Sequence, residues 1–242
     1  MFRNLCLASV TLSVLMATSH AKADFVLGGF DASRGGVCSV NEGTLLNNLR
    51  AAIAAAFPDV TLSGNATLTE DCLSSIDFLL IGAPRTEYSQ VNPLCPKEQD
   101  AMVGFINAGG RALIFTDNRD FEEADQSFLQ PFGMHEASIL GGSQQASVLD
   151  PSSHPITDGP FGTIFHFHTY YPGYFDDLGP STLLATLDAD GEPVLAVIDP
   201  GVLSDSSGGV VFFGDTSMII DSELTQDNAN LVLNALAFLI GQ

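Results

Sequence analysis

The chain has 242 residues, of which 29 are acidic and eight are basic, so its formal net charge is −21. Nucleic acids and anionic lipids are bound by basic patches, and an acidic surface repels both. The composition therefore excludes nucleic-acid binding, and a surplus of this size is typical of proteins that stay soluble in a salty medium.

The first 23 residues have the pattern of a secretory signal peptide. Arg3 precedes a short apolar stretch, and Ala21-Lys22-Ala23 matches a small-residue cleavage site. That stretch is too short to span a bilayer stably, and no later segment is long and apolar enough to do so. The sequence predicts a signal peptide over 1–23 and an exported chain, periplasmic or secreted, with no membrane insertion.

Strand and helix patterns alternate in the first half of the mature chain. A strand at 25–29 is followed by a helix with Leu45, Leu49 and Ile53 at four-residue spacing, and then by a short strand at 60–62. We find no repeat or linker run, so residues 24–242 are predicted to form one domain.

The segment 76–118 reads as strand, loop, helix and strand. Its two strands are continuous apolar runs, which suits strands buried on both faces. Pro96 fits a first helical turn, and Gly109-Gly110 ends the helix before the second strand at 112–115. A unit of this length predicts a right-handed parallel crossover.

From residue 136 the pattern changes to short β-runs. These lie at 146–149, 163–168, 182–187 and 194–198, and a buried strand at 210–213 and an apolar helix at 225–240 follow them. The predicted class is α/β, with a mainly parallel, doubly wound sheet and a β-rich insertion before the last core strand.

The order of these motifs resembles the class I glutamine amidotransferase-like family. DFLLIGAP, EQDAMVGFINAGGRALIFTDN, FLQPFGM, HPITDGPFG, GGVVFFGD and NANLVLNALAFL follow one another over nearly the whole mature chain. The resemblance implies a flavodoxin-like fold and is closest to exported members without amidotransferase activity. In catalytic members a cysteine nucleophile follows the strand that corresponds to 112–115, whereas Thr116-Asp117-Asn118 stands here.

Three cysteines remain after export: Cys38, Cys72 and Cys95. An odd number in an oxidising compartment indicates one pair and one leftover thiol. Cys38 and Cys95 follow the first and third strands, which are neighbours in a flavodoxin-like order, so we predict a disulfide between them. The alternative is a reactive thiol at either position, which would need a positioned base.

Charged residues follow several predicted strands at the carboxyl edge, where open α/β sheets bind ligands. Arginine binds anions through paired hydrogen bonds, so three arginines there predict a small anionic ligand. The predicted site residues are Asp31, Arg34, Arg85, Asp117, Asn118, Arg119 and Asp215. In the alternative, the arginines pair with the aspartates and only tie loops together.

His166 and His168 are predicted to lie on one face of a strand. Two histidines and a carboxylate are a possible zinc set, but no third ligand has a diagnostic spacing. The acidic run from Asp117 to Glu123 also lacks the ordered spacing of a calcium loop. The sequence therefore predicts no metal site and no cofactor, and it favours structural histidines.

Two functions remain. The first is an exported binding or scaffold module that uses the carboxyl edge for a small anionic ligand or a protein partner. The alternative is a hydrolase in which Asp117 replaces the missing cysteine and His166 or His168 acts as acid–base. The alternative requires a histidine nitrogen within about 3 Å of Asp117.

Overall fold

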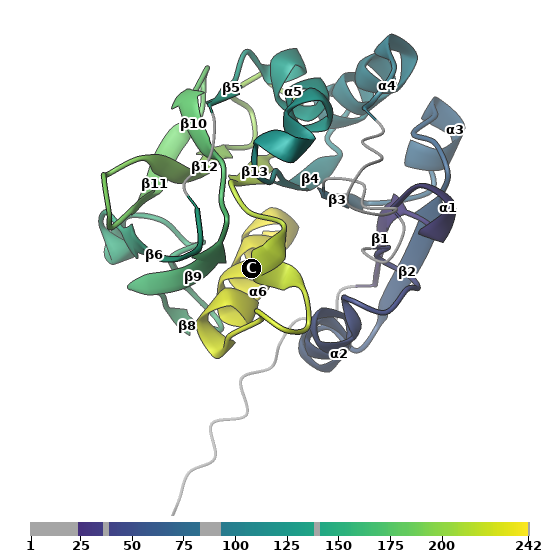
Figure 1. Ribbon diagram of the computed structural model, residues 1–242. Helices are drawn as coiled ribbons and strands as arrows, with labels where there is room; N and C mark the ends of the chain where they lie inside the picture. Colours follow the sequence, from purple (N-terminus) through teal and green to yellow (C-terminus); the bar gives the residue numbers. More distant parts are fainter. Residues whose placement is uncertain (1–23, 36–38, 83–92, 138–140, 242) are drawn as a thin grey trace, which may run out of the picture.

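The computed structural model describes residues 24–35, 39–82, 93–137 and 141–241. A nine-stranded sheet with the order β2-β1-β3-β4-β13-β12-β11-β6-β9 forms its centre (Figure 1). The first five strands are parallel, and their order is the 2-1-3-4-5 of flavodoxin-like folds. They are β2 (Val60–Asn65), β1 (Phe25–Phe30), β3 (Phe78–Gly82), β4 (Arg111–Phe115) and β13 (Val210–Phe213).

The other four strands of the sheet are antiparallel to their neighbours. They come from the segment between β4 and β13, which confirms the predicted β-rich insertion and shows that it extends the central sheet. They are β12 (Pro193–Ile198), β11 (Thr182–Leu187), β6 (Ser143–Val148) and β9 (His166–Tyr170). Two small sheets complete the insertion: β5 (His135–Ala137) with β10 (Tyr174–Asp177), and β7 (Asp158–Gly159) with β8 (Gly162–Thr163).

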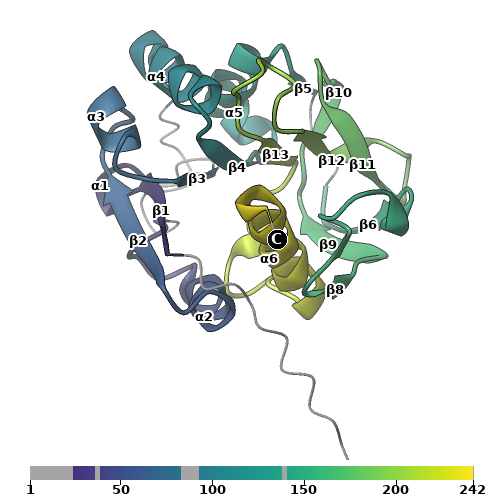
Figure 2. The same cartoon turned by 180° about the vertical axis from the view of Figure 1, so that it is seen from behind.

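Helices cover both faces of the parallel strands (Figures 1 and 2). The α-helices of the described residues are α1 (Ala32–Gly35), α2 (Asn47–Ala56), α3 (Glu70–Leu73), α4 (Pro96–Asn107), α5 (Glu122–Leu129) and α6 (Gln226–Ile240). The 3₁₀ turns are η1 (Arg119–Phe121), η2 (Gln130–Phe132), η3 (Pro151–Ser153) and η4 (Ser217–Ile219). None of these helices is long and apolar enough to cross a membrane.

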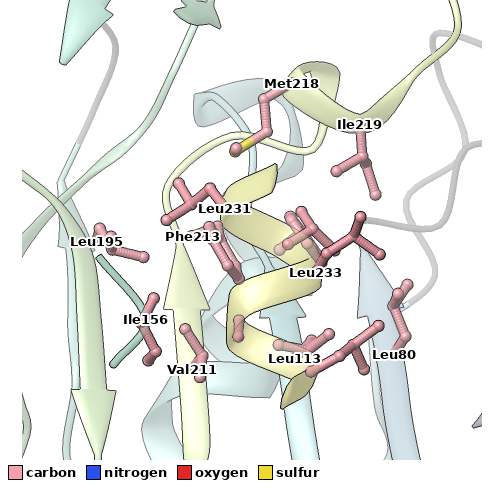
Figure 3. Packing of buried hydrophobic residues seen from close by; sticks show 14 of the residues in the cluster. Leu80, Leu113, Ile156, Leu195, Val211, Phe213, Met218, Ile219, Leu231 and Leu233 are labelled. Atoms are coloured by element: carbon pink, nitrogen blue, oxygen red, sulfur yellow. The ribbon is translucent and has the colours of Figure 1, made fainter. Parts of the chain in front are cut away.

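Alternate residues of the central strands face opposite cores, as the continuous apolar runs predicted. Leu113 and Val211 face α6, whose Leu231 and Leu233 pack on the sheet in Figure 3. Ile114, the next residue of β4, faces the other way. It packs with Leu79 and Phe212 of the neighbouring strands in the core that includes residues of α4 and α5. The fold is therefore doubly wound, with α2 and α6 on one face and α3, α4 and α5 on the other.

Local signals set the ends of α6. Thr225 caps its N-terminus by accepting a hydrogen bond from the Asn228 N–H (3.1 Å), and Gly241 ends it with a φ of +87°. The buried Asn228 side chain also accepts from the N–H of His168 (2.9 Å) and donates to its carbonyl (3.0 Å). A helix side chain thus satisfies the outward-facing backbone of β9, which protects the edge of the sheet.

Candidate functional site

The predicted site residues that the structure describes lie at the carboxyl edge of the parallel strands, in two groups. Asp31 and Arg34 follow β1. Asp117 and Asn118 follow β4, and Asp215 follows β13, which is hydrogen-bonded to β4. Strand β3 lies between the two groups.

At the β1 end, Arg34 is committed to a buried ion pair with Glu98 of α4. Its Nη1 bonds Glu98 Oε1, and its Nη2 lies 3.0 Å from Oε2 and 3.1 Å from the Pro93 carbonyl. Arg34 is only 5% exposed. The guanidinium therefore joins α1 to α4, and Glu98 is the partner in place of the aspartates that the sequence alternative named.

The Glu98 carboxylate is well satisfied. Burial alone would raise its pKa, but the hydrogen bond and charge of Arg34 and the backbone N–H groups of Cys95 and Leu68 together lower it. Asp31 has a local role as well, because its Oδ1 accepts from the backbone N–H of Ser33 (2.9 Å) in the first turn of α1. This end of the edge is a structural junction, and Glu98 also lines a cavity of about 610 Å³ between α3 and α4.

Several predicted residues fall outside the described part of the chain. These are Cys38, Arg85 and the side chain of Arg119. The three-arginine anion site and the Cys38–Cys95 disulfide therefore stay predictions. Within the described part, Cys95 is exposed and Cys72 is half-buried, and the two are not bonded to each other.

The β4 and β13 end holds four buried carboxyl groups, which we name the buried acid cluster: Asp117, Asp125, Glu136 and Asp215. Each is at most 4% exposed. Burial raises the pKa of Asp125, Glu136 and Asp215 well above the usual range. The negative charge of Asp117 raises the pKa of Asp125 and Asp215 further, and the negative charge of Asp125 raises the pKa of Glu136. The neutral forms of these three acids are therefore favoured.

Hydrogen bonds connect this cluster to the surrounding loops. The backbone N–H of Asp117 donates to Asp125 Oδ2 (3.0 Å), and Asp117 Oδ1 accepts from the backbone and side-chain amides of Asn118 (2.8 Å each). Asp215 accepts from the N–H groups of Ser217 and Tyr170, both at 2.7 Å. The cluster therefore fixes the loops after β4 and β13 and the end of β9.

The turn after β9 packs directly against the cluster. A Cβ at Gly173 would lie 1.5 Å from Glu136 Oε1, so the close approach requires glycine. The Gly173 N–H donates to the Gly214 carbonyl after β13 (2.8 Å).

An open cavity of about 410 Å³ lies beside the cluster, and we name it the edge cavity. Two of its walls come from Asn118 and Ser217, which bond Asp117 and Asp215. Its lining residues are Asn118, Asp120, Phe121, Tyr170, Tyr171, Ser217, Ile220, Ser222 and Glu223.

Two adjacent tyrosines dominate the exposed aromatic surface of this cavity. The rings of Tyr170 and Tyr171 are 4.8 Å apart between centroids and nearly perpendicular, at 86°. Their exposed fractions are 39% and 43%.

Tyr171 is the one non-glycine residue of the described chain with a positive φ, +57°. The following residue is Pro172, which restricts Tyr171 toward extended conformations and makes this backbone more unusual. Hydrogen bonds from Tyr170 to Asp215, and from the Tyr171 N–H to the Gly142 carbonyl (2.9 Å), hold it in place. Such strain costs about 1–3 kcal/mol and concentrates at ligand-binding and active sites.

The two histidines lie on one face of β9, as predicted, because the intervening Phe167 is buried. His166 Nδ1 bonds the hydroxyl of Ser147 (2.9 Å), and His168 Nε2 bonds that of Ser143 (2.6 Å). They line a separate groove of about 330 Å³. Within the described ranges, no group of three or more His, Cys, Asp or Glu side chains is arranged to hold a metal ion.

Sequence comparison gives no matching family model and no matching curated protein. Solved structures do match the fold. The N-terminal domain of mmIFT52 aligns with a TM-score of 0.66 and 12% identity, over 88% of this chain and 96% of that one. A ThuA-like protein from Bacteroides uniformis aligns with a TM-score of 0.56 and 12% identity, over 94% and 96%.

A GMP synthase-like protein from Thermoplasma acidophilum aligns with a TM-score of 0.53 and 11% identity, over 90% of this chain and 98% of that one. At such low identity these likenesses show the fold alone. The chain has an α/β, flavodoxin-like fold of the glutamine amidotransferase-like kind, which confirms the predicted class.

Sequence reasoning missed the residues that define the β4 and β13 end of the edge. Asp125 and Glu136 look like any other acidic residues of an acidic chain. The available signal for the cavity was Tyr170-Tyr171-Pro172, an aromatic pair directly before a proline at the end of a predicted strand. The predicted residues that the structure brings together are Asp117, Asn118 and Asp215.

Proposed function

We propose that this protein is an exported, non-catalytic binding module that holds a small polar ligand or a partner's side chain in the edge cavity. The observation that carries this proposal is the strained backbone of Tyr171 at the wall of that cavity. A strained residue with an exposed ring, held by hydrogen bonds on both sides, is typical of a preorganised binding site. The sequence predicts an anionic ligand, and binding of such a ligand would require Arg85 and Arg119.

The absence of amidotransferase chemistry is part of the proposal. Thr116-Asp117-Asn118 stands where the catalytic members of the resembled family have their cysteine. The hydrolase alternative is less well supported, because Asp117 is only 1% exposed and one of its oxygens accepts two hydrogen bonds from Asn118. The imidazole rings of His166 and His168 bond the hydroxyl groups of Ser147 and Ser143 in β6.

Export and the disulfide can be tested together by non-reducing peptide mapping of the protein recovered from the exported fraction. We expect an N-terminus at Asp24 and a peptide pair crosslinked through Cys38 and Cys95. An intact Met1 in that fraction would contradict export, and a crosslink that contains Cys72 would contradict the pairing.

Binding at the edge cavity can be tested with Tyr171→Gly. Glycine tolerates a φ of +57°, so this variant removes the ring without a backbone penalty. In a thermal-shift screen of anionic, neutral and cationic metabolites, we expect at least one compound to stabilise the wild type but not Tyr171→Gly.

The matched control is Phe165→Ala, which removes an exposed ring (60% exposed) outside the cavity lining. It should respond to the compound as the wild type does. A set of compounds that stabilises Tyr171→Gly as strongly as the wild type would contradict the proposed site. For an anionic hit, Arg119→Ala should abolish the response if the arginine prediction is correct.

A further inference from the structure

We infer that the ligand of the edge cavity carries an organic cation, an alkylated or quaternary ammonium group. This inference rests on the proposed function and names the chemistry of its ligand. Two features of the cavity lead to it: the pair of tyrosine rings and the carboxylates beside them.

The tyrosine rings supply the surface that such a cation prefers. An ammonium group within about 6 Å of an aromatic centroid is attracted by the negative face of the ring. Tyr170 and Tyr171 meet at 86° and form a corner in which both rings stay about two-fifths exposed. Phe121 also lines the cavity, but it is only 4% exposed, so the two tyrosines supply the accessible aromatic surface.

Two carboxylates of the lining favour a cation. Asp120 is exposed and Glu223 is half-buried, and both line the cavity. A carboxylate or phosphate ligand would approach two negative charges, whereas a cation would be attracted by them.

The buried acid cluster makes this arrangement stable. Its acids lie behind the loops that carry Asn118 and Ser217, and backbone N–H groups of Asp117, Asn118, Ser217 and Tyr170 donate hydrogen bonds to them. The Tyr170 N–H is held by Asp215, so the aromatic corner is positioned before a ligand arrives. A cavity of about 410 Å³ is within the range of small-molecule sites.

Isothermal titration of the full mature chain with choline chloride tests this inference. Its neutral isostere, 3,3-dimethylbutanol, has the same shape and hydroxyl but no charge. We expect choline to bind at least about tenfold more tightly than the isostere, since the charge adds cation–π and carboxylate attraction. Tyr171→Gly should abolish choline binding.

Glu223→Gln and Asp120→Asn should each weaken choline binding by roughly threefold to tenfold, since each removes one attractive charge. The matched control is Asp205→Asn, which changes the net charge equally at an exposed position outside the cavity lining and should leave the affinity unchanged. Equal loss in all three charge variants would reduce the effect to net charge and overturn the inference.

Two outcomes separate this inference from the proposed function. An anion or dimethylbutanol could bind as tightly as choline and lose this binding in Tyr171→Gly. That result would contradict the inference of a cationic ligand but would support the proposed site. Choline binding that persists in Tyr171→Gly, or no binding of choline, would overturn the inference. The proposed site itself falls only if no compound of the metabolite screen depends on Tyr171.

Discussion

The two ends of the carboxyl edge differ in how their buried ionisable groups are stabilised. At the β1 end, Arg34 and Glu98 form a buried ion pair that several backbone groups complete. At the β4 and β13 end, the acids of the buried acid cluster are crowded together, and burial favours their neutral forms. The paired end is held by its ion pair and lies beside a cavity of about 610 Å³ that Glu98 and Cys95 line, and the acidic end lies beside the edge cavity.

This difference reverses the pH dependence of stability. The pKa of Glu98 is lowered on folding, so its contribution is present above its ordinary value near 4.5 and is lost as the pH falls through the folded value. The pKa values of Asp125, Glu136 and Asp215 are raised, so their contribution is complete below their ordinary values near 4 and is lost as the pH rises.

Removing the Arg34–Glu98 ion pair at the β1 end should have the largest effect on stability. Glu98→Ala leaves the Arg34 charge buried without its carboxylate, which costs about 3–5 kcal/mol in comparable buried pairs. Chemical denaturation at pH 7 measures the loss. The double variant Arg34→Met/Glu98→Leu removes both charges and should recover most of it. If both variants are equally destabilised, the ion pair is not the cause.

A smaller effect should come from the acidic end. Glu136→Gln cannot ionise, so it should remove part of the loss of stability between about pH 5 and pH 9 and make the melting temperature less dependent on pH. One kcal/mol corresponds to about 2–4 °C for a domain of this size, and we expect a difference of that order at pH 9.

The matched control for Glu136→Gln is Glu123→Gln, an exposed carboxylate on α5. It should keep the pH dependence of the wild type. A Glu136→Gln profile that is parallel to the wild type from pH 5 to pH 9 would contradict the assignment of a raised pKa to this end of the edge.

The fold could be predicted because its signals are local. Continuous apolar runs such as the one ending at Ile81 identified strands buried on both faces, and α6 follows its sequence signals from Thr225 to Gly241. The resemblance supplied the strand order. The start of α2 has no such signal, since its N-cap is Leu46, which makes no side-chain capping bond.

The site could be predicted only in part, because tertiary contacts decide it. Strand ends placed Asp117 and Asp215 at the same edge, and their proximity followed from the order of the strands. The partner of Arg34 could not be foreseen, since Glu98 looks like a helix-capping residue of α4. A positive φ at Tyr171 depends on contacts with the loops after β13 and before β6, which no local pattern records.

The central claim is that the acidic end of the edge binds an organic cation, and a crystal structure with choline tests it most directly. We predict the trimethylammonium group in the edge cavity against the ring of Tyr171, on the side of Glu223. A structure in which the cavity stays empty at saturating choline, or in which choline lies at the Arg34–Glu98 end, would contradict the account.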